Sequence, residues 1–410
     1  MAEATQQTFF TETPLERVYR IKDAIAEGGD EAQKARRLPE ETADILIREG
    51  LYRFTLPHEL GGENASVRET IDVLEAIAAI DGSVGWNVMI GSEINAIAAG
   101  GMDPVIAKEV YVDNPRVIMC GGGGPGTQPS YAIEQKDGSY RVWGQATFLS
   151  GCHNAEWAFM VAPIVEDGNP KMDDAGNPIF RMWFLHKSEW EIKDTWHMAG
   201  LRGSGSHDVF ADGALVPERL VPVDLFSVPA HYPNPVFRIP VALRLSFNKA
   251  AVAIGVARGA LDAFSDIAQN KIPLLTTSAL KDKPIAHYRM GEGEASLRAV
   301  RSFLMETMDD VVEELAAGAP TPGPETTKLA RLACTHAANV SMHVVDSVHN
   351  AAGTTSLRMD CPLERKLRDA HGCATHRWVA HPLYAELGKM FLGHPGLPEF
   401  SGEGDAQPGK

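Results

Sequence analysis

The stretch Gly144-Gln-Ala-Thr-Phe-Leu-Ser-Gly-Cys-His-Asn-Ala-Glu-Trp157 predicts two strands joined by a turn. Strand formers at 147–149 precede Ser150-Gly151, which interrupts the run, and a second apolar run begins at Trp157. The turn puts the hydroxyl of Ser150 beside the flat apolar ring of Phe148. Such a pair suits a flat cofactor that forms hydrogen bonds, and an ordinary β-turn serine is the alternative interpretation.

Short strand patterns and turn signals surround this stretch from residue 115 to about 229. The runs 131–135 and 140–143 flank Asp137-Gly138, which is a strong hairpin signal. Further short strands are expected at 157–161, 180–185 and 208–210. We therefore predict a β domain of barrel or sandwich type over residues 115–232.

Helical patterns precede the β domain. Ser66-Val-Arg-Glu69 is a capping box, and apolar residues then recur at helical spacing. A further helix is expected after Asp81-Gly82, and Asp103-Pro104 predicts the start of another. Residues 1–114 are therefore predicted to form an N-terminal helical domain.

Long helical intervals follow the β domain. Breakers delimit four of them, at 241–271, 285–317, 325–350 and 363–380. Four long helices with short connections predict a C-terminal four-helix bundle over residues 233–400, followed by a flexible tail at 401–410. The alanine- and glycine-rich stretch 250–259 permits close helix packing and led us to expect subunit assembly through this bundle. The fold class is therefore mainly α with a central β domain.

Composition limits the possible partners. The chain has 410 residues and a formal net charge of −16, which argues against nucleic acid or an anionic membrane as the main partner. Its five cysteines show no paired spacing and are expected to be reduced thiols in a cytoplasmic protein. The polar N-terminus does not resemble a signal peptide, and no apolar run approaches the length of a membrane span.

Two other groups of residues each allow two interpretations. The stretch 196–208 contains Ser204 and Ser206 among glycines, so it is either a phosphate-binding loop or an ordinary glycine-rich connection. One helix face presents His336, His343 and Asp346, but histidines packed between helices are more common than metal ligands. We predict no metal.

Three motifs in this helical–β–helical order resemble the acyl-CoA dehydrogenase superfamily. They are Phe148-Leu-Ser-Gly with Trp157, the segment Ala199-Gly-Leu-Arg-Gly-Ser-Gly-Ser-His-Asp-Val209, and Ala352-Gly with Arg368-Asp-Ala370. The resemblance covers residues 15 to 393. Within the superfamily, the sequence most resembles the oxygenase components of two-component flavin-dependent monooxygenases.

The resemblance implies a site for reduced FMN or FAD between the β domain and the bundle. Ser150 would form a hydrogen bond with flavin N5, and Phe148 and Trp196 would flank the ring. Ser204 and Ser206 would approach the phosphate or ribityl region. The remaining implied cofactor-binding residues, some acting from a neighbouring subunit, are Lys271, Gly353, Thr354 and Thr355.

The resemblance also implies the catalytic residues. In many dehydrogenases a glutamate base occupies the position of Arg377, which cannot accept a proton at neutral pH, whereas the monooxygenases have a histidine one residue earlier, here His376. His376 would act near flavin C4a, where reduced flavin and O₂ form a hydroperoxide that oxygenates the substrate. The substrate pocket would include residues of one N-terminal helix, namely Trp86, Asn87 and Ile90.

The expected substrate is a small aromatic or heteroaromatic molecule of indole type. Phenol-hydroxylating relatives use a histidine of the N-terminal helical domain to activate the phenol. This sequence has no histidine between His58 and His153. The expected partners are a separate NAD(P)H-dependent flavin reductase and further copies of the chain in a homotetramer. An acyl-CoA dehydrogenase and a non-catalytic oligomeric scaffold are the alternative functions.

Overall fold

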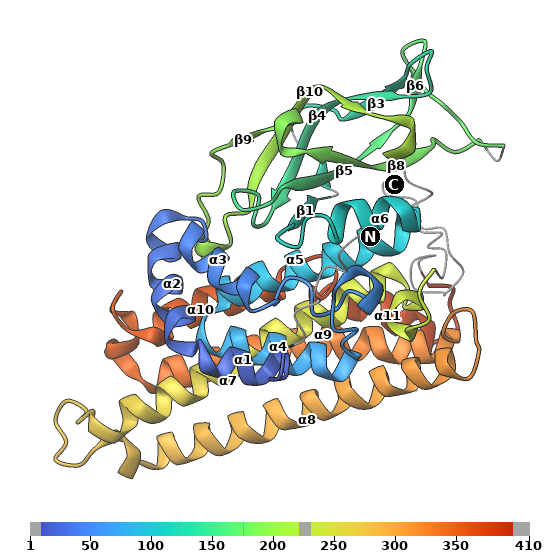
Figure 1. Cartoon of the computed structure of the whole chain (residues 1–410). Helices are drawn as coiled ribbons and strands as arrows, with labels where there is room; N and C mark the ends of the chain where they lie inside the picture. Colours follow the sequence, from blue (N-terminus) through green and yellow to red (C-terminus); the bar gives the residue numbers. More distant parts are fainter. Residues whose placement is uncertain (1–9, 123, 126, 175, 221–230, 397–410) are drawn as a thin grey trace.

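The arrangement of three groups of elements positions the site. The computed structural model describes residues 10–122, 124–125, 127–174, 176–220 and 231–396. Figure 1 shows N-terminal helices between a β domain and a group of long helices. The predicted fold class is thereby confirmed. The tail predicted at 401–410 lies outside the described residues.

The N-terminal helices begin where the capping signals predicted them. The Ser66 hydroxyl accepts from the backbone N–H of Glu69, and the Glu69 carboxylate accepts from the backbone N–H of Ser66. Asp81 caps the next helix, α5, which is mostly apolar and is buried along nearly its whole length. The helices are α1 (Pro14–Arg20), α2 (Lys22–Ala35), α3 (Glu40–Arg48), α4 (Val67–Ile80), α5 (Gly82–Gly101) and α6 (Pro104–Tyr111).

The β domain consists of two main sheets packed around a small apolar core. One sheet has the order β1-β5-β8, in which β1 and β5 are parallel; the other has the order β2-β4-β10-β9, with β3 paired to β4. Buried apolar side chains fill the space between them. The strands are β1 (Met119–Gly122), β2 (Gly124–Pro125), β3 (Tyr131–Glu134), β4 (Tyr140–Leu149), β5 (Trp157–Pro163), β6 (Val165–Glu166), β7 (Asn169–Pro170), β8 (Phe180–His186), β9 (Glu191–Lys193) and β10 (His207–Val216).

The C-terminal helices follow the predicted intervals, except at one end. They are α7 (Val241–Asn270), α8 (Pro284–Ala316), α9 (Pro324–Ala351), α10 (Pro362–Ala374) and α11 (Leu383–Phe391). The prediction that a helix continues to residue 380 and carries His376 is wrong, because α10 ends at Ala374. The turn that follows is fixed by side chains of α7 and α9: Ser246 donates to the carbonyl of Trp378, and Asn339 donates to that of Val379.

The alanine- and glycine-rich part of α7 packs inside the chain. A Cβ added at Gly255 would lie 2.3 Å from the carbonyl oxygen of Glu75, and one at Gly259 would lie 2.1 Å from that of Ala79. Both carbonyls belong to α4, so this stretch allows α4 and α7 to pack closely. Because it is covered within one chain, it cannot be the surface that joins subunits, and that motivation for assembly was wrong.

None of the described helices is a candidate membrane span. Within the part of the chain that the structure describes, every helix lacks either the length or the apolar character that a bilayer crossing requires.

Candidate active site

Three buried serine hydroxyls form a chain that ends at Ser150, in the turn after β4. The oxygen of Ser150 lies 2.6 Å from that of Ser206, which lies 2.6 Å from that of Ser204. The indole nitrogen of Trp86 in α5 donates to Ser150 across 3.0 Å. A hydroxyl offers one donor and two acceptor positions. Whichever of Ser150 and Ser206 donates to the other, one position on Ser150 therefore remains for a further hydrogen bond.

The aromatic ring beside this hydroxyl is exposed and held by an unusual backbone. Phe148 has a φ of 63°, which is rare for a bulky residue and costs of order 1–3 kcal/mol. Its side chain remains 58% exposed, and its ring centroid lies 6.0 Å from that of Trp196 at an interplanar angle of 84°. The turn therefore presents an apolar surface next to Ser150, as the sequence predicted.

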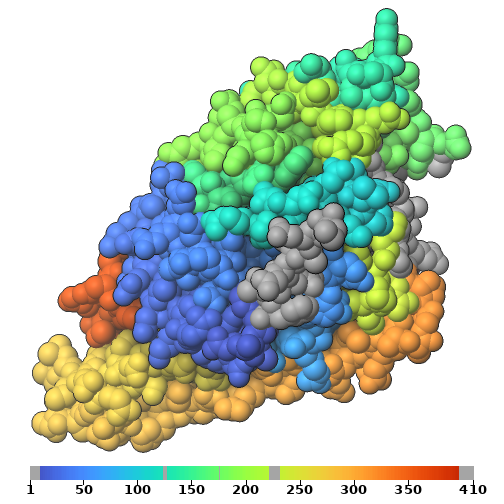
Figure 2. All heavy atoms as spheres, viewed as in Figure 1, coloured from blue at the N-terminus to red at the C-terminus, as the bar shows by residue number. Residues whose placement is uncertain are grey.

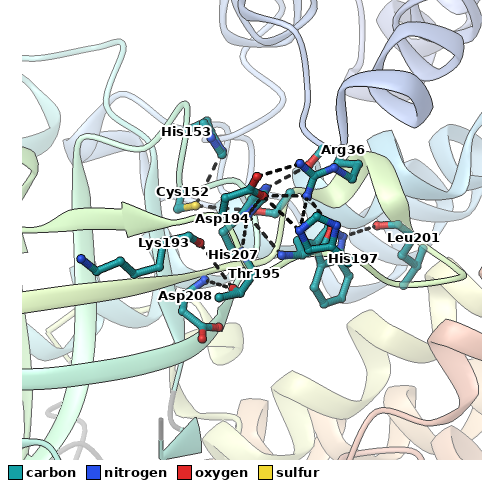
Figure 3. Close-up of polar contacts among 12 residues, drawn as sticks. Arg36, Cys152, His153, Lys193, Asp194, Thr195, His197, Leu201, His207 and Asp208 are labelled. Atoms are coloured by element: carbon teal, nitrogen blue, oxygen red, sulfur yellow. Dashed lines mark hydrogen bonds and ion pairs between the residues drawn. The ribbon is translucent and has the colours of Figure 1, made fainter. Parts of the chain in front are cut away.

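The loop of Asp194, Thr195 and His197, which also contains Trp196, is fastened to the end of α2 by Arg36 (Figure 3). Arg36 donates to both carboxylate oxygens of Asp194, at 2.7 and 2.9 Å, and to the carbonyl of Trp196 at 3.1 Å. His207 Nδ1 accepts from the backbone N–H groups of Thr195 and Trp196, at 3.2 and 3.3 Å. These contacts fix the position of the Trp196 backbone.

His207 is held as one neutral tautomer. Because Nδ1 accepts two hydrogen bonds, the ring proton is on Nε2, which donates to the carbonyl of Arg36 across 3.2 Å. Burial lowers the pKa of His207, which favours the same neutral form. The only sequence signal for this role is the place of His207 at the end of the 196–208 stretch.

Ser204 and Ser206 lie inside the loop and do not face solvent. Both are buried, and their hydroxyls face each other in the serine chain. A contact of either hydroxyl with a cofactor phosphate stays a prediction.

His376 lies against Trp86, just beyond the end of α10. The two ring centroids are 5.5 Å apart at an interplanar angle of 61°. The backbone N–H of Trp378 donates to His376 Nδ1 across 3.4 Å, so the ring proton lies on Nε2. Burial, with the positive charges of Lys249 and Arg377, lowers the pKa of His376 well below its usual value. At neutral pH this imidazole is a neutral hydrogen-bond donor.

A buried ion pair between α5 and α7 lies close to His376. The ammonium of Lys249 forms an ion pair with the carboxylate of Glu93, which also accepts from Asn248 across 2.9 Å. Burial raises the pKa of Glu93 and lowers that of Lys249. No sequence motif indicates this pair, although Glu93 lies seven residues after Trp86 and so on the same helix face.

The three predicted pocket residues differ in their contacts. Trp86 and Ile90 are buried one helical turn apart, on one face of α5. Asn87 is also buried, but its amide nitrogen donates to the carbonyls of Ser83 and Gly203 at 3.0 and 3.1 Å. Asn87 therefore holds the loop that contains the serine chain.

The other predicted cofactor residues form a second group at the far end of α7. Lys271 donates to the carbonyl of Ala352 and to the hydroxyl of Thr355, the latter across 2.7 Å. Lys271, Thr354 and Thr355 line a groove of about 880 Å³, next to Gly353. The end of α7 lies on the side of the bundle away from the β domain (Figure 1). One chain therefore does not join this group to Ser150 and His376.

The histidines considered as metal ligands contact different partners. His336 lies 2.8 Å from the hydroxyl of Tyr384, whereas Asp346 pairs with His371 across 2.9 Å. His343 lies 3.9 Å from Asp346. In the described portion of the chain, no group of three or more metal-ligating side chains comes together.

The Arg368-Asp369 motif fastens α10 to the loop of the second motif. Asp369 accepts from the backbone N–H of Leu201 across 2.6 Å, and Arg368 donates to the carbonyl of Ala199 at 2.5 Å. Two motifs that are 168 residues apart in the sequence thus meet in space.

Comparisons with known proteins agree with this arrangement. The model of the acyl-CoA dehydrogenase N-terminal domain matches residues 20–107, and that of the C-terminal domain matches residues 248–381. Indole-3-acetate monooxygenase of Pseudomonas putida is 30% identical over 373 residues, which are 90% of this chain and 91% of that protein. The oxygenase subunit HsaA of a flavin-dependent monooxygenase from Mycobacterium tuberculosis is 28% identical, over 87% of this chain and 90% of HsaA.

A solved structure supports the same assignment. The crystal structure of the HsaA monooxygenase from M. tuberculosis superimposes with a TM-score of 0.82 and 26% identity, over 94% of this chain and 98% of that one. The chain therefore belongs to the acyl-CoA dehydrogenase superfamily, in its branch of flavin-dependent monooxygenases. It is an oxidoreductase that uses reduced flavin with O₂.

Proposed function

We propose that this chain is the oxygenase component of a two-component system and oxygenates a small aromatic or heteroaromatic molecule of indole type. A separate NAD(P)H-dependent reductase supplies the reduced flavin. The similarity to a protein named indole-3-acetate monooxygenase supports the substrate class. The observation that carries the proposal is the meeting of Ser150, Trp86 and His376 beside the exposed ring of Phe148.

The residues around Ser150 fit a flavin ring. An exposed aromatic ring on a strained backbone lies next to a hydroxyl that has one hydrogen-bonding position left. The N–H at N5 of a reduced flavin is a donor that Ser150 can accept, and Phe148 and Trp196 offer apolar contact to the ring. Strain of this kind is typical of positions that bind ligands.

Reduced flavin, when bound, supplies the electrons that activate O₂ for transfer of one oxygen atom. Ser150 would accept a hydrogen bond from the N–H at N5, and this bond would slow the loss of that proton and so the release of hydrogen peroxide. The neutral Nε2–H of His376 would donate a hydrogen bond to the oxygen that becomes negatively charged as the substrate is oxygenated. Trp86 and Ile90 cover this region with apolar surface and exclude water.

A second copy of the chain completes the cofactor site in this proposal. Lys271, Thr354 and Thr355 form a groove that one chain does not bring to Ser150. Leu274 and Leu275, in the loop that follows α7, are 89% and 98% exposed. Figure 2 shows that this loop projects from the molecule, at the lower left. An exposed apolar surface beside a polar groove is typical of a subunit contact.

The test measures transfer of oxygen from O₂ to the substrate. The chain is mixed with an unrelated NADH-dependent flavin reductase, with FMN or FAD, with ¹⁸O₂, and with indole, indole-3-acetate or a sulfide. We expect a product that carries one ¹⁸O atom. Consumption of O₂ that yields only hydrogen peroxide with every compound would contradict the proposal.

A further inference from the structure

The interior between α5 and α7 holds more positive than negative charge. Arg244 and Lys249 are both buried, at 3% and 1% exposure, and Glu93 is the carboxylate that lies near both of them. Of the described residues, no other acidic group acts on either cation. Two cations therefore share one carboxylate. A buried charge without a partner is strongly destabilising, so such a surplus is expected where a ligand supplies the missing charge.

The polar atoms of this cluster are also incompletely satisfied. Nε of Arg244 and Oδ1 of Asn248 are buried without a hydrogen-bond partner. Asn248 also contacts Glu93 through its amide nitrogen, so its free oxygen lies beside the ion pair. Buried groups of this kind are rare in folded proteins and point to a partner that binds from outside.

The cluster of Glu93, Arg244, Asn248 and Lys249 lies within the length of a small molecule from Trp86 and His376. The charge of Lys249 acts on His376, so the ion pair and the catalytic histidine are neighbours. Trp86, which packs on His376, and Glu93 share one face of α5, seven residues apart. Seven helical residues span about 10 Å. An aromatic ring held at Trp86 and His376 would place a short acidic side chain near the cations.

We propose that Lys249 and Arg244 bind the carboxylate of the substrate, so that the chain acts on small aromatic acids and not on neutral aromatic compounds. The inference rests on the proposed function, which it narrows to one substrate class. Glu93 holds Lys249 in place and offsets part of the charge of both cations. Removing the charge of Glu93 should therefore strengthen the binding of an acid, and removing the charge of Lys249 should weaken it.

The experiment measures binding to the full chain without flavin, so that it does not depend on oxygenation. Equilibrium dialysis compares indole-3-acetate and phenylacetate with indole-3-acetamide and phenylacetamide, which have nearly the same shape but no charge. A charge-assisted hydrogen bond is worth a factor of roughly 10 to 150 in affinity. We expect the wild-type chain to prefer at least one acid over its amide by about tenfold or more.

Two variants with opposite expectations separate charge recognition from structural damage. Lys249→Met should abolish the preference for the acid, whereas Glu93→Gln should increase it, and both should change binding of the amide much less than binding of the acid. The double variant Glu93→Gln/Lys249→Met removes both charges of the pair, so neither member is left without its partner. It replaces either single variant if that variant does not fold. It should bind the acid more weakly than the wild type does.

Two results would overturn the inference: equal binding of acids and amides by the wild type, or a preference that these variants do not change. The proposed function fails separately. A chain that prefers acids but transfers no ¹⁸O to any of them would retain the binding site and lose the activity. A chain that oxygenates neutral indole and does not distinguish acids from amides would have the proposed activity without the carboxylate-binding site.

Discussion

The indole nitrogen of Trp86 donates a hydrogen bond to the hydroxyl of Ser150 across 3.0 Å. This bond links α5 of the N-terminal domain to the turn after β4. The same indole ring packs on His376. Trp86 thus contacts both residues to which we assign catalytic roles, one through its polar edge and the other through its ring.

Trp86→Phe keeps an aromatic ring but removes the donor. We expect a loss of about 1 kcal/mol in the free energy of unfolding, measured with urea, because Ser150 loses a buried partner. More hydrogen peroxide per product should also form, because the hydroxyl becomes free to turn. The control is Trp190→Phe, which removes a similar 3.2 Å bond to the carbonyl of Leu185 in the β domain. If Trp190→Phe raised the hydrogen peroxide formed per product as much as Trp86→Phe does, the effect would not be specific to Trp86.

Ser150→Ala should preserve the fold and uncouple the reaction. A neutral hydrogen bond contributes about 0.5–1.5 kcal/mol, so hydrogen peroxide release should rise by roughly tenfold at most. The measurement is the ratio of hydrogen peroxide to oxygenated product. Ser139→Ala, in the hairpin between β3 and β4, also removes a hydroxyl hydrogen bond and should leave the ratio unchanged. Equal ratios for Ser150→Ala and wild type would show that Ser150 does not contact the flavin.

His376→Ala should lower product formation by about 10²–10⁴-fold while the protein still binds reduced flavin. His371→Ala, a nearby exposed histidine on α10, is the matched control. Because the pKa of His376 lies well below 6.5, the ring stays neutral from pH 6 to 8, and its contribution to the rate should not change in that range. A rate that falls with a midpoint near pH 6.5 in the wild type, but not in His376→Ala, would contradict this assignment.

Stability should depend on pH through His153, whose ring lies 4.9 Å from that of His207. Burial, followed by the charges of His207 and Arg37, lowers the pKa of His153 to about 4. The unfolded chain therefore binds this proton first, and stability is lost as pH falls from about 6.5 toward 4. The melting temperature should drop more between pH 7.5 and pH 5 in the wild type than in His153→Asn. The exposed His343→Asn should behave as the wild type does, and equal drops in all three proteins would contradict the prediction.

The chain should form a dimer or a tetramer at micromolar concentration, as measured by light scattering. Leu274→Asp places a charge on the exposed loop that follows α7 and should weaken both assembly and flavin binding. Met172→Asp, at an exposed site of the β domain, should change neither. A fully active monomer would show that one copy is sufficient.

Local signals were enough to predict much of the fold. Ser66 starts α4 through both bonds of its capping box, and Gly138 has a φ of 81° in the predicted hairpin. Each signal depends on neighbours within a few residues, which is why the sequence alone carries it. The end of α10 was not predictable in this way, because contacts from Ser246 and Asn339 on other helices fix the turn that follows.

The polar interior of the site was less accessible to prediction. Glu93 and Lys249 lie 156 residues apart, and charged residues on a helix ordinarily indicate its solvent side. Only the packing of α5 against α7 brings them together. Likewise, the sequence suggested cofactor contacts for Ser204 and Ser206, but not that their hydroxyls would form a chain with Ser150.

The left-handed backbone of Phe148 has a practical consequence for protein engineering. Glycine or asparagine would adopt this φ with less strain, so a screen for heat resistance alone should favour their appearance at position 148. The same exchange would remove the exposed ring on which we expect the flavin to rest. Campaigns that select this enzyme for durability should therefore score retention of flavin in every round, or they will enrich robust proteins that have lost their chemistry.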